Sequence, residues 1–151
     1  TTIAEAAEEV LIRYGRKVEV LDGDRIRNVF PKTGFSKEER DAHILRVGFM
    51  ASLLEKQGVV VLCSFISPYG ETRDKARAMC SSFIEVHVNT SLKVCERRDP
   101  KGLYRKVRAG EIKNFTGIDD PYEQPRNPDI ALDTEKETLG TCVKVIVGAI
   151  L

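Results

Sequence analysis

The sequence lacks the features that mark several classes of protein. Its four cysteines, Cys63, Cys80, Cys95 and Cys142, form no C-x-x-C pair and share no metal-ligand spacing with the two histidines. We find no signal peptide and no apolar run of membrane-spanning length. Internal repeats and low-complexity segments are also absent. These absences predict a reduced, cytoplasmic protein that has no membrane partner.

The charge balance excludes a second class of protein, those that bind a bulk polyanion. The formal net charge of the 151 residues is only +1, so the chain as a whole is not suited to bind a nucleic acid or another bulk polyanion. Any anion site must therefore come from local clustering of basic residues. The length predicts a single domain over residues 1–151, large enough to bury an adequate core.

Helical and strand patterns alternate along the chain. The predicted helices cover 2–14, 36–57, 70–82, 91–96 and 138–150, and the predicted strands cover 17–21, 58–66, 83–89 and 129–133. A loop is expected at 31–36, and Ser36 with Glu39 forms a capping box that begins the second helix. The first helix is expected to bury Tyr14 and the last one Leu139, each among other apolar residues of one face.

The segment from Gly58 to Ile66 is a continuous apolar run, which is typical of a strand buried on both faces of a parallel sheet. Cys63 lies within it and is expected to be a small buried thiol. His87 alternates within the next strand, where a structural role is favoured over a ligand role. Together the patterns predict a three-layer α/β/α fold with a mostly parallel sheet.

The most basic part of the chain lies between Arg97 and Lys113. It holds seven Lys or Arg against two acidic residues, Asp99 and Glu111. One interpretation is a lid, approximately 99–120, that closes over a ligand with several negative charges. Its basic side chains would neutralise a phosphoryl group; they are Lys101, Arg105, Lys106 and Arg108. The alternative is a solvated basic helix.

Two carboxylates follow the first predicted strand, at Asp22 and Asp24. In open α/β sheets, ligands bind beyond the carboxyl ends of strands. Carboxylates there suit a metal–water shell or a base that takes a hydroxyl proton, and Arg27 within the next turn can hold a phosphate or sulfate. The same D-x-D pattern also caps helices, and both readings stay open.

The first residues, Thr1 and Thr2, lead straight into a helical pattern. This is what remains when a phosphate-binding P-loop, G-x-x-x-x-G-K-[ST], is cut just after its lysine. The alternative is a native N-terminus that happens to be Thr-Thr. In the first case the strand before the loop, which lies mid-sheet in P-loop folds, is also missing, so we expect the functional protein to extend upstream of Thr1.

Several strings together resemble one family. They include LDGDRIR, GFSKEER, VVVLCSFISPY, RDKAR, FIEVHVN, CERRDPKGLY, AGEIKNFTGIDDPYE and NPDIALDT, and they cover nearly all of the chain. They are similar to the adenylyl-sulfate kinases (APS kinases), which have a P-loop NTPase fold. That resemblance implies ATP- and Mg²⁺-dependent phosphorylation of the ribose 3′-hydroxyl of adenosine 5′-phosphosulfate (APS), which gives PAPS.

The resemblance also implies roles for individual residues. Asp24 would be the base or orienting group at the 3′-hydroxyl, and Lys106 would assist catalysis. Phe35 and Phe115 would sandwich the substrate adenine. The other expected APS-binding residues are Arg27, Arg40, His43, Ile66, Ser67, Lys101 and Asn114. Thr1, Thr2 and Arg98 would bind ATP, with the Thr1 hydroxyl also ligating Mg²⁺.

The chain departs from the family pattern at a few positions. The family usually has Asn where this chain has Arg25 and His43, and Arg in place of Leu45; two basic residues often stand at Gly70 and Glu71. His43 is expected to face the substrate and to donate a hydrogen bond with pH sensitivity. The departures suggest a divergent branch, such as the kinase domain of a chain fused to ATP sulfurylase, and we expect a homodimer.

Two other functions compete with the kinase. One is a regulatory module on the same fold, fused to ATP sulfurylase, that binds PAPS and catalyses nothing. The other is a different nucleotide kinase, which would be expected to lack Phe35, Phe115 and the KNFTGI string. The twenty or so residues upstream of Thr1 discriminate the first alternative, because an intact P-loop favours the enzyme.

Overall fold

The computed structural model describes residues 1–30 and 34–151, so the first part of the predicted loop at 31–36 lies outside the described residues. The helices are α1 (Thr2–Arg13), α2 (Gly23–Val29), α3 (Lys37–Glu55), α4 (Gly70–Arg77), α5 (Leu92–Arg98), α6 (Leu103–Arg108) and α7 (Leu139–Ile150). The strands are β1 (Lys17–Asp22), β2 (Val59–Ser64), β3 (Val86–Asn89) and β4 (Ile130–Asp133).

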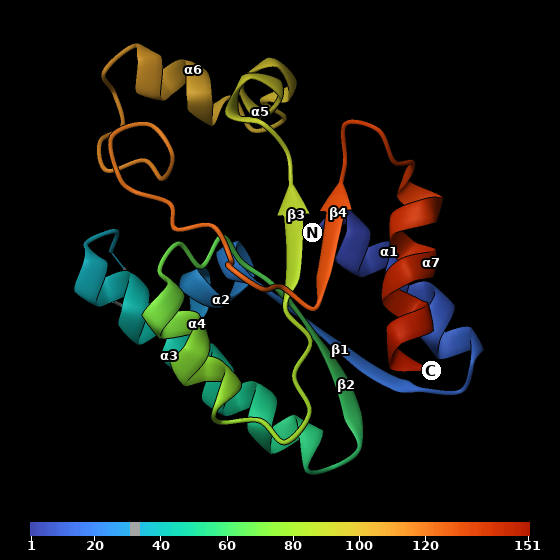
Figure 1. Cartoon of the computed structure of the whole chain (residues 1–151). Coiled ribbons are helices and arrows are strands. Elements are labelled where there is room, and N and C mark those ends of the chain that lie inside the picture. Colours follow the sequence, from blue (N-terminus) through green and yellow to red (C-terminus); the bar gives the residue numbers. More distant parts are fainter. Residues whose placement is uncertain (31–33) are drawn as a thin grey trace.

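All the strand pairing among these elements is parallel, as predicted. β1 pairs with β2 from Lys17 opposite Val59 to Asp22 opposite Ser64. β3 pairs with β4 from Val86 opposite Ile130 to Asn89 opposite Asp133. The described strands form two separate two-stranded sheets, and β2 and β3 are not hydrogen-bonded to each other. In Figure 1 the arrows of β3 and β4 point toward the end of the molecule that carries α5 and α6.

Helices cover both faces of the strands, which confirms the three-layer α/β/α architecture. In Figure 1, α1 and α7 lie on one side of the strands, and α3 and α4 lie on the other. The larger core joins α1 and α7 to both sheets; its buried residues are Ala7, Leu11, Ile130, Leu132, Cys142, Val143, Ile146 and Val147. A smaller core of Leu21, Val47 and Ala51 packs α3 against β1 and β2.

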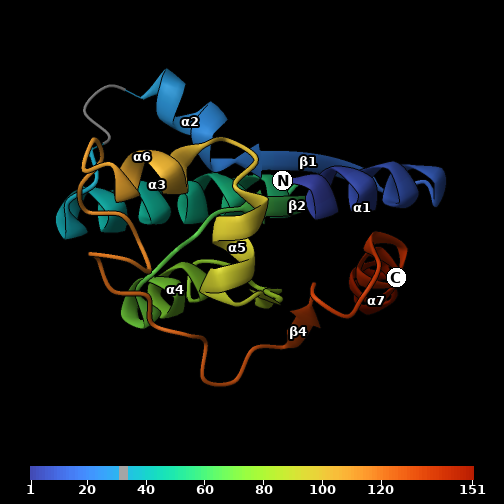
Figure 2. The same cartoon turned by 90° about the horizontal axis from the view of Figure 1, so that it is seen from above.

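The basic segment forms a cap at one end of the molecule. α5 begins directly after β3, and α5, α6 and the loop that follows them form the top of Figure 1, beyond the carboxyl ends of β3 and β4. Figure 2 looks down on this cap, with α2 and the ends of β1 and β2 beneath and beside it. The lid predicted at about 99–120 therefore lies over the strand ends, where α/β proteins place their ligands.

The start of α3 follows the predicted capping box. The Ser36 hydroxyl accepts from the Glu39 amide at 3.2 Å, and the Glu39 carboxylate accepts from the Ser36 amide at 3.0 Å. Two amides that the helix leaves unpaired are thereby satisfied. This fixes where α3 begins and hence the position of Arg40 and His43 on it.

Three burial predictions are wrong. Tyr14 is 65% exposed and Leu139 46% exposed, because each lies at a helix end, where the helical face turns away from the core. Cys63 is exposed, and the other residues of β2 are only half-buried. β2 pairs with β1 along one edge and with no described strand along the other, so the strand is not enclosed on both sides.

Within the described residues, no helix has both the length and the apolar character needed to cross a bilayer.

Substitutions at the neighbouring residues Leu11 and Ile12 test which side chains form the larger core. Leu11 is fully buried, whereas Ile12 is 54% exposed. We expect Leu11→Ala to lower the free energy of unfolding by about 2–5 kcal/mol, because it leaves a cavity between α1 and α7. Ile12→Ala, measured by the same denaturant titration, should change it by less than about 1 kcal/mol. Equal losses for the two variants would contradict this assignment of the core.

Candidate active site

The end of β1 carries the first of two carboxylates, and that group is held by several bonds. Asp22 is the N-cap of α2: its Oδ1 accepts from the amides of Asp24 at 3.1 Å and Arg25 at 3.2 Å. Its Oδ2 accepts from the Thr1 hydroxyl at 2.6 Å. The Thr1 bond, followed by these amide bonds, lowers the pKa of Asp22 against the opposing effect of burial. The predicted capping role of the D-x-D pattern is thus confirmed for Asp22.

Asp24, the second carboxylate, has a different environment. Its side chain is 68% exposed and lies in the first turn of α2, at the edge where β1 ends. Its ion-pair partner is Lys101, which reaches it from the loop between α5 and α6. This bond raises the pKa of Lys101. The structure therefore brings a predicted site residue of the lid into contact with one on the strand edge, 77 residues apart in sequence.

The glycine between the carboxylates permits a close approach of the start of α2 to the end of β2 and the residue after it. A Cβ atom on Gly23 would lie 3.1 Å from the Phe65 ring and 3.4 Å from the Ser64 carbonyl oxygen. At the same edge the Ser64 hydroxyl lies 3.5 Å from the Thr1 hydroxyl. Thr1, Asp22 and Ser64 thus form a group of oxygen atoms at the carboxyl ends of two neighbouring strands.

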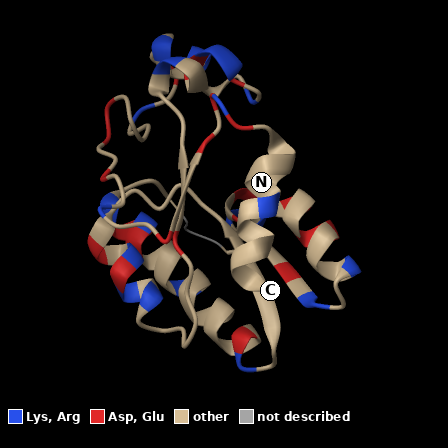
Figure 3. Ribbon diagram, turned by 45° about the vertical axis from the view of Figure 1, so that its right-hand side comes forward, with Lys and Arg blue, Asp and Glu red and all other residues tan. Residues whose placement is uncertain are grey.

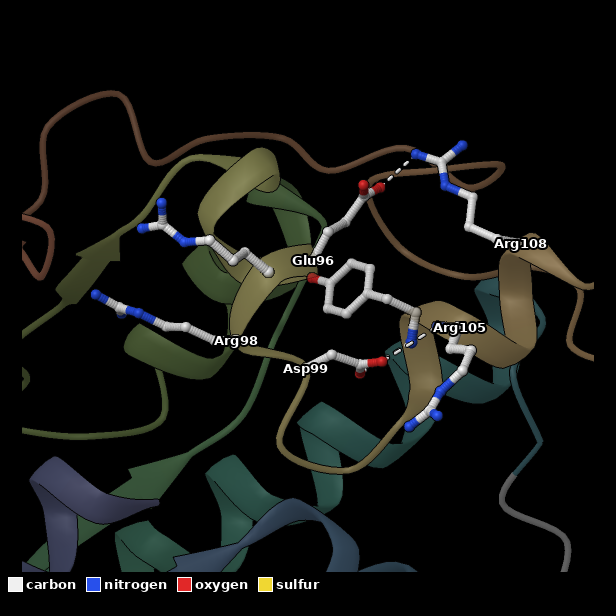
Figure 4. A pocket seen from close by; sticks show the side chains of 7 residues that line it. Glu96, Arg98, Asp99, Arg105 and Arg108 are labelled. Carbon is white, nitrogen blue, oxygen red and sulfur yellow. Dashed lines mark hydrogen bonds and ion pairs between the residues drawn. The ribbon is translucent and has the colours of Figure 1, made fainter.

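The segment that includes α5 and α6, part of which is predicted to be a lid, has a basic surface around a cavity of about 460 Å³. Figure 3 shows basic residues gathered on these helices, and Figure 4 shows the side chains that line the cavity. The lining residues are Glu96, Arg97, Arg98, Asp99, Tyr104, Arg105 and Arg108. Asp99 joins the two helices, since its carboxylate accepts from the amides of Tyr104 and Arg105, each at 3.1 Å.

The predicted basic residues of the lid differ in their partners. Arg98 donates from Nη2 to the carbonyl of Thr134 at 2.7 Å and from Nη1 to its hydroxyl at 3.0 Å, which ties α5 to the end of β4. Lys106 is exposed, and no ion pair of its side chain is found within residues 1–30 and 34–151. Thr2 is exposed at the start of α1, next to Thr1.

The two phenylalanines lie on separate loops. Phe35 is 57% exposed, and the guanidinium carbons of Arg27 and Arg40 lie 4.8 Å and 5.5 Å from its ring centroid. Phe115 is half-buried and makes an edge contact with Tyr104, with centroids 5.0 Å apart. The side chain of Arg27 also donates to the Gly34 carbonyl at 2.8 Å. Each ring is thus held by neighbours of its own, and the two rings do not contact each other in the described chain.

Arg40 lies between these two loops and is buried, at 6% exposure. Its Nε donates to the Phe35 carbonyl at 2.9 Å. Its Nη1 donates to the Thr116 hydroxyl at 2.7 Å and its Nη2 to the Asn114 carbonyl at 2.6 Å. The structure thus places Arg40 in direct contact with Phe35 and with Asn114, which are also predicted site residues.

Sequence reasoning missed Asp119, which shapes the second loop. Its carboxylate accepts from the amides of Asn114 at 2.8 Å and Phe115 at 2.5 Å, and these bonds lower its pKa, that from Phe115 most. Asn114 has a φ of 56°, in the left-handed region that Asn tolerates better than most residues. One sequence signal could have identified this role of Asp119: an Asp that follows an Asn by a few residues in a turn that contains Gly.

His43 lies beneath the strand ends and not on an open surface. It is 1% exposed, and its ring centroid lies 5.5 Å from that of Phe65. Neither ring nitrogen has a hydrogen-bond partner among the described residues. Burial lowers the pKa of His43, the charges of Arg27 and Arg46 lower it further, and an interaction with the Gly23 backbone, too poor in geometry to count as a hydrogen bond, opposes them. The role of His43 toward the substrate stays a prediction; in this structure its ring is buried against Phe65.

The last predicted site residues follow β2. Ile66 is 61% exposed. Ser67 has a φ of 42°, and its carbonyl accepts from Arg73 Nη1 at 2.7 Å, which fixes the turn. Their backbone lies at the same edge of the molecule as Asp24, because β1 and β2 are parallel and end at Asp22 opposite Ser64.

Comparison with known proteins points to one family. The family model described as adenylylsulphate kinase matches residues 1–133. An adenylyl-sulfate kinase of Rippkaea orientalis is 56% identical over 147 residues, which are 97% of this chain and 81% of that protein. One from Microcystis aeruginosa is 55% identical over 140 residues, covering 92% of this chain and 77% of that protein.

A solved structure is also similar. The APS kinase of Mycobacterium tuberculosis in complex with AMPPNP and APS aligns with a TM-score of 0.94 at 40% identity. The alignment covers 98% of this chain and 88% of that one. The sequence and the fold are therefore similar to the same group of proteins.

The burial of His43 predicts a pH-dependent stability. An unfolded histidine titrates near about 6.5, and burial lowers the pKa of His43 in the folded chain. Below about pH 6.5 the unfolded chain therefore binds a proton that the folded chain does not, so unfolding becomes more favourable as the pH falls. We expect the free energy of unfolding to drop between about pH 7.5 and about pH 5.5 by up to about 1.4 kcal/mol per pH unit from this group.

Denaturant unfolding of His43→Gln at both pH values checks this expectation. The variant should lose most of the drop, whereas His87→Gln, which alters a half-buried histidine, should lose less of it. A drop in His43→Gln as large as in the wild type would show that His43 is not its source.

Proposed function

The chain belongs to the adenylylsulphate kinase family, and from that membership we propose that it phosphorylates the 3′-hydroxyl of adenosine 5′-phosphosulfate with ATP, giving PAPS and ADP. The observation that carries this proposal is the family match over residues 1–133, which includes the strand edge with Asp24 and the lid with Lys101. The relatives named above are kinases, which supports the enzyme over a regulatory module that only binds nucleotide.

In the proposed reaction Asp24 acts on the attacking hydroxyl. Its exposed carboxylate lies at the strand edge, where it can orient the 3′-hydroxyl and accept its proton. A bond then forms between the 3′-oxygen and the γ-phosphorus while the bond from that phosphorus to the β-bridging oxygen breaks, and ADP leaves. Lys101 must release Asp24 for this step, because the ion pair otherwise occupies the carboxylate.

The lid supplies positive charge in this proposal. Phosphoryl transfer needs little covalent help, so positioning and charge neutralisation carry the catalysis. Lys106 is exposed without an ion-pair partner in the described chain and is thus available to a phosphoryl group. Closure of the lid would bring it over the strand ends and exclude water.

The nucleotide sites follow from the same placement. Phe35 and Phe115 would stack on the substrate adenine, with the backbone of Ile66 and Ser67 beside it. Arg27 and Arg40, whose guanidinium carbons lie 4.8 Å and 5.5 Å from the Phe35 ring centroid, would hold the phosphosulfate. Thr1 and Thr2 would bind the phosphates of ATP at the start of α1, and Arg98 would lie against its base.

The oxygen atoms at the strand edge fit a magnesium ion. Mg²⁺ prefers hard oxygen ligands and is usually held by one or two carboxylates together with substrate phosphates. The Thr1 hydroxyl and the Asp22 carboxylate, which are 2.6 Å apart, are ligands of this kind. When bound there, Mg²⁺ would neutralise phosphate charge on ATP.

We also propose that a strand and a phosphate loop encoded upstream of Thr1 complete the sheet. The support comes from β2 and β3, which share the larger core through Val60, Leu62 and Val86 but do not pair with each other. A strand between them would satisfy backbone groups along both facing edges. The intact mass of the protein isolated from its source, compared with that of residues 1–151, tests this.

We propose that the protein is cytoplasmic, because an enzyme of sulfate activation works where ATP is plentiful. We also propose that it forms a homodimer. Light scattering of the purified protein measures its assembly, and fractionation of cells measures its location. A monomer, or a hexamer, would contradict the homodimer.

The activity is tested by ADP release with and without APS. We expect release to require both APS and Mg²⁺, and Asp24→Asn to lower kcat by about 10²-fold or more through loss of the base. Asp74→Asn, which alters an exposed carboxylate on α4, is the matched control and should retain wild-type kcat. If APS does not stimulate ADP release by the full-length protein, the proposed reaction is wrong.

A second variant tests the stacking role. Removal of one aromatic face from a base loses about 1–3 kcal/mol, so Phe115→Ala should raise KM for APS by about 5- to 150-fold with a small effect on KM for ATP. Phe49→Ala, at an exposed phenylalanine of α3, should leave both constants unchanged. An unchanged KM for APS in Phe115→Ala would remove Phe115 from the substrate site.

A further inference from the structure

We propose that Arg73, in the first half of α4, is a positioning residue for the base of the substrate. It holds the turn that contains Ile66 and Ser67 and ties this turn to the chain that returns from the predicted lid, at Glu123. The inference rests on the proposed function, in which the backbone of Ile66 and Ser67 lies beside the substrate adenine. Arg73 acts through that backbone and touches neither nucleotide.

The turn after β2 contains a backbone conformation that needs support. Ser67 has a φ of 42°, in the left-handed region that is unfavourable for a residue with a side chain. The Ser67 carbonyl accepts from Arg73 Nη1 at 2.7 Å, and the positive charge of the donor strengthens this bond. The bond therefore helps to fix where the backbone of Ile66 and Ser67 lies before a ligand arrives.

The other terminal nitrogen of Arg73 reaches a second segment. Its Nη2 donates to the Glu123 carbonyl at 2.8 Å. In Figures 1 and 2 the chain after α6 passes α4 on its way to β4, and Glu123 belongs to this return. One planar guanidinium thus bonds both the turn, residues 66–70, and the return segment, residues 120–123.

The turn and the return segment are joined by further bonds that do not involve Arg73. The Glu123 amide donates to the Pro68 carbonyl at 2.8 Å, and the Gly70 amide donates to the Glu123 carboxylate at 2.7 Å. The hydroxyl of Tyr69, a buried residue, donates to Asp120 at 3.2 Å. Because Asp120 and Glu123 follow the predicted lid directly, these bonds give the lid a fixed end beside the turn.

An alternative role for Arg73 is to balance the charge of Glu85. Its Nε lies 2.8 Å from the Glu85 carboxylate, and the Arg73 side chain is only 12% exposed. A second cation, Arg77, lies 3.7 Å from the same carboxylate. Arg77 donates instead to Asp129 and to the Phe83 carbonyl. The bonds to the turn and to the return segment are therefore what distinguishes Arg73 from Arg77.

Arg73→Lys separates the two roles. Lysine keeps the positive charge but cannot reproduce the planar fork that bonds two carbonyls at once. We expect KM for APS to rise about tenfold, with kcat and KM for ATP nearly unchanged, because the predicted ATP residues lie on other elements. An unchanged KM for APS would show that Arg73 only balances Glu85 and would overturn the proposal.

Arg77→Lys is the matched control, since it alters an arginine of the same helix that lies beside the same carboxylate. We expect thermal unfolding to show similar losses of stability in the two variants, and KM for APS to rise only in Arg73→Lys. An equal rise in both variants would assign the effect to a general loosening of α4, against the proposal.

Hydrogen exchange of the protein without nucleotide provides a readout that does not depend on turnover. We expect the amides of Gly70 and Glu123 to exchange about tenfold faster in Arg73→Lys, both together, and at the wild-type rate in Arg77→Lys. Faster exchange at only one of the two amides, or at neither, would overturn the role of Arg73. Failure of the wild type to phosphorylate APS would instead overturn the proposed function, so the two failures are distinguishable.

Glu123→Ala keeps the test decisive if Arg73→Lys does not fold. Glu123 is exposed, and its side chain supplies the acceptor of the Gly70 amide. Because this variant removes one bond between the turn and the return segment, we expect KM for APS to rise about threefold. An unchanged KM for APS in Glu123→Ala would show that the two segments do not act as a unit, and the proposal would be wrong.

Discussion

The bonds of the Asp22 carboxylate determine how the chain is arranged at the carboxyl-terminal end of β1. One of its oxygens caps α2 through the amides of Asp24 and Arg25, and the other binds the Thr1 hydroxyl at the start of α1. Three elements, β1, α1 and α2, therefore meet at a single group, which these bonds keep ionised. The direction of α2, and hence the position of Asp24 and Arg27, depends on that arrangement. Gly23 adds a steric condition, since a Cβ atom there would lie 3.1 Å from the Phe65 ring, and the ring would have to move by a few tenths of an ångström.

The two carboxylates that look alike in the sequence thus have different environments. Asp22 is enclosed by hydrogen bonds and stabilises the fold locally, whereas Asp24 is exposed and has a cation from the lid as its partner. Such a division of roles by environment is common where one acid must support a site and another must react. In the proposed reaction the exposed Asp24 would be the reacting group, and Asp22 would support the site.

Much of the fold was predictable from the sequence because its signals are local. The capping box at Ser36, the helix starting at Thr138 and the alternation of helices with parallel strands depend on residues close to one another in the chain. Burial was less predictable, since the exposure of Cys63 depends on which strands flank β2 and not on the apolar run around it. Of the candidate site, the carboxylates after β1 and the run of basic residues from Arg97 to Lys113 were evident in the sequence, whereas their roles, including that of a lid, stay predictions. The burial of Arg40 and His43, and the bonds of Asp119, arise from contacts over long sequence distances that no local pattern reveals.

In the proposed reaction, the ion pair between Lys101 and Asp24 bears on whether ATP is hydrolysed when no acceptor is bound. A carboxylate at a phosphoryl-transfer site can activate water as readily as a sugar hydroxyl, and ATP would then be hydrolysed without a product being made. While the lid ammonium holds Asp24, that carboxylate is not a free base toward solvent. An incoming nucleotide that displaces the ammonium would release the base only when an acceptor is present. In the proposed reaction, this surface contact would couple consumption of ATP to occupancy by the acceptor.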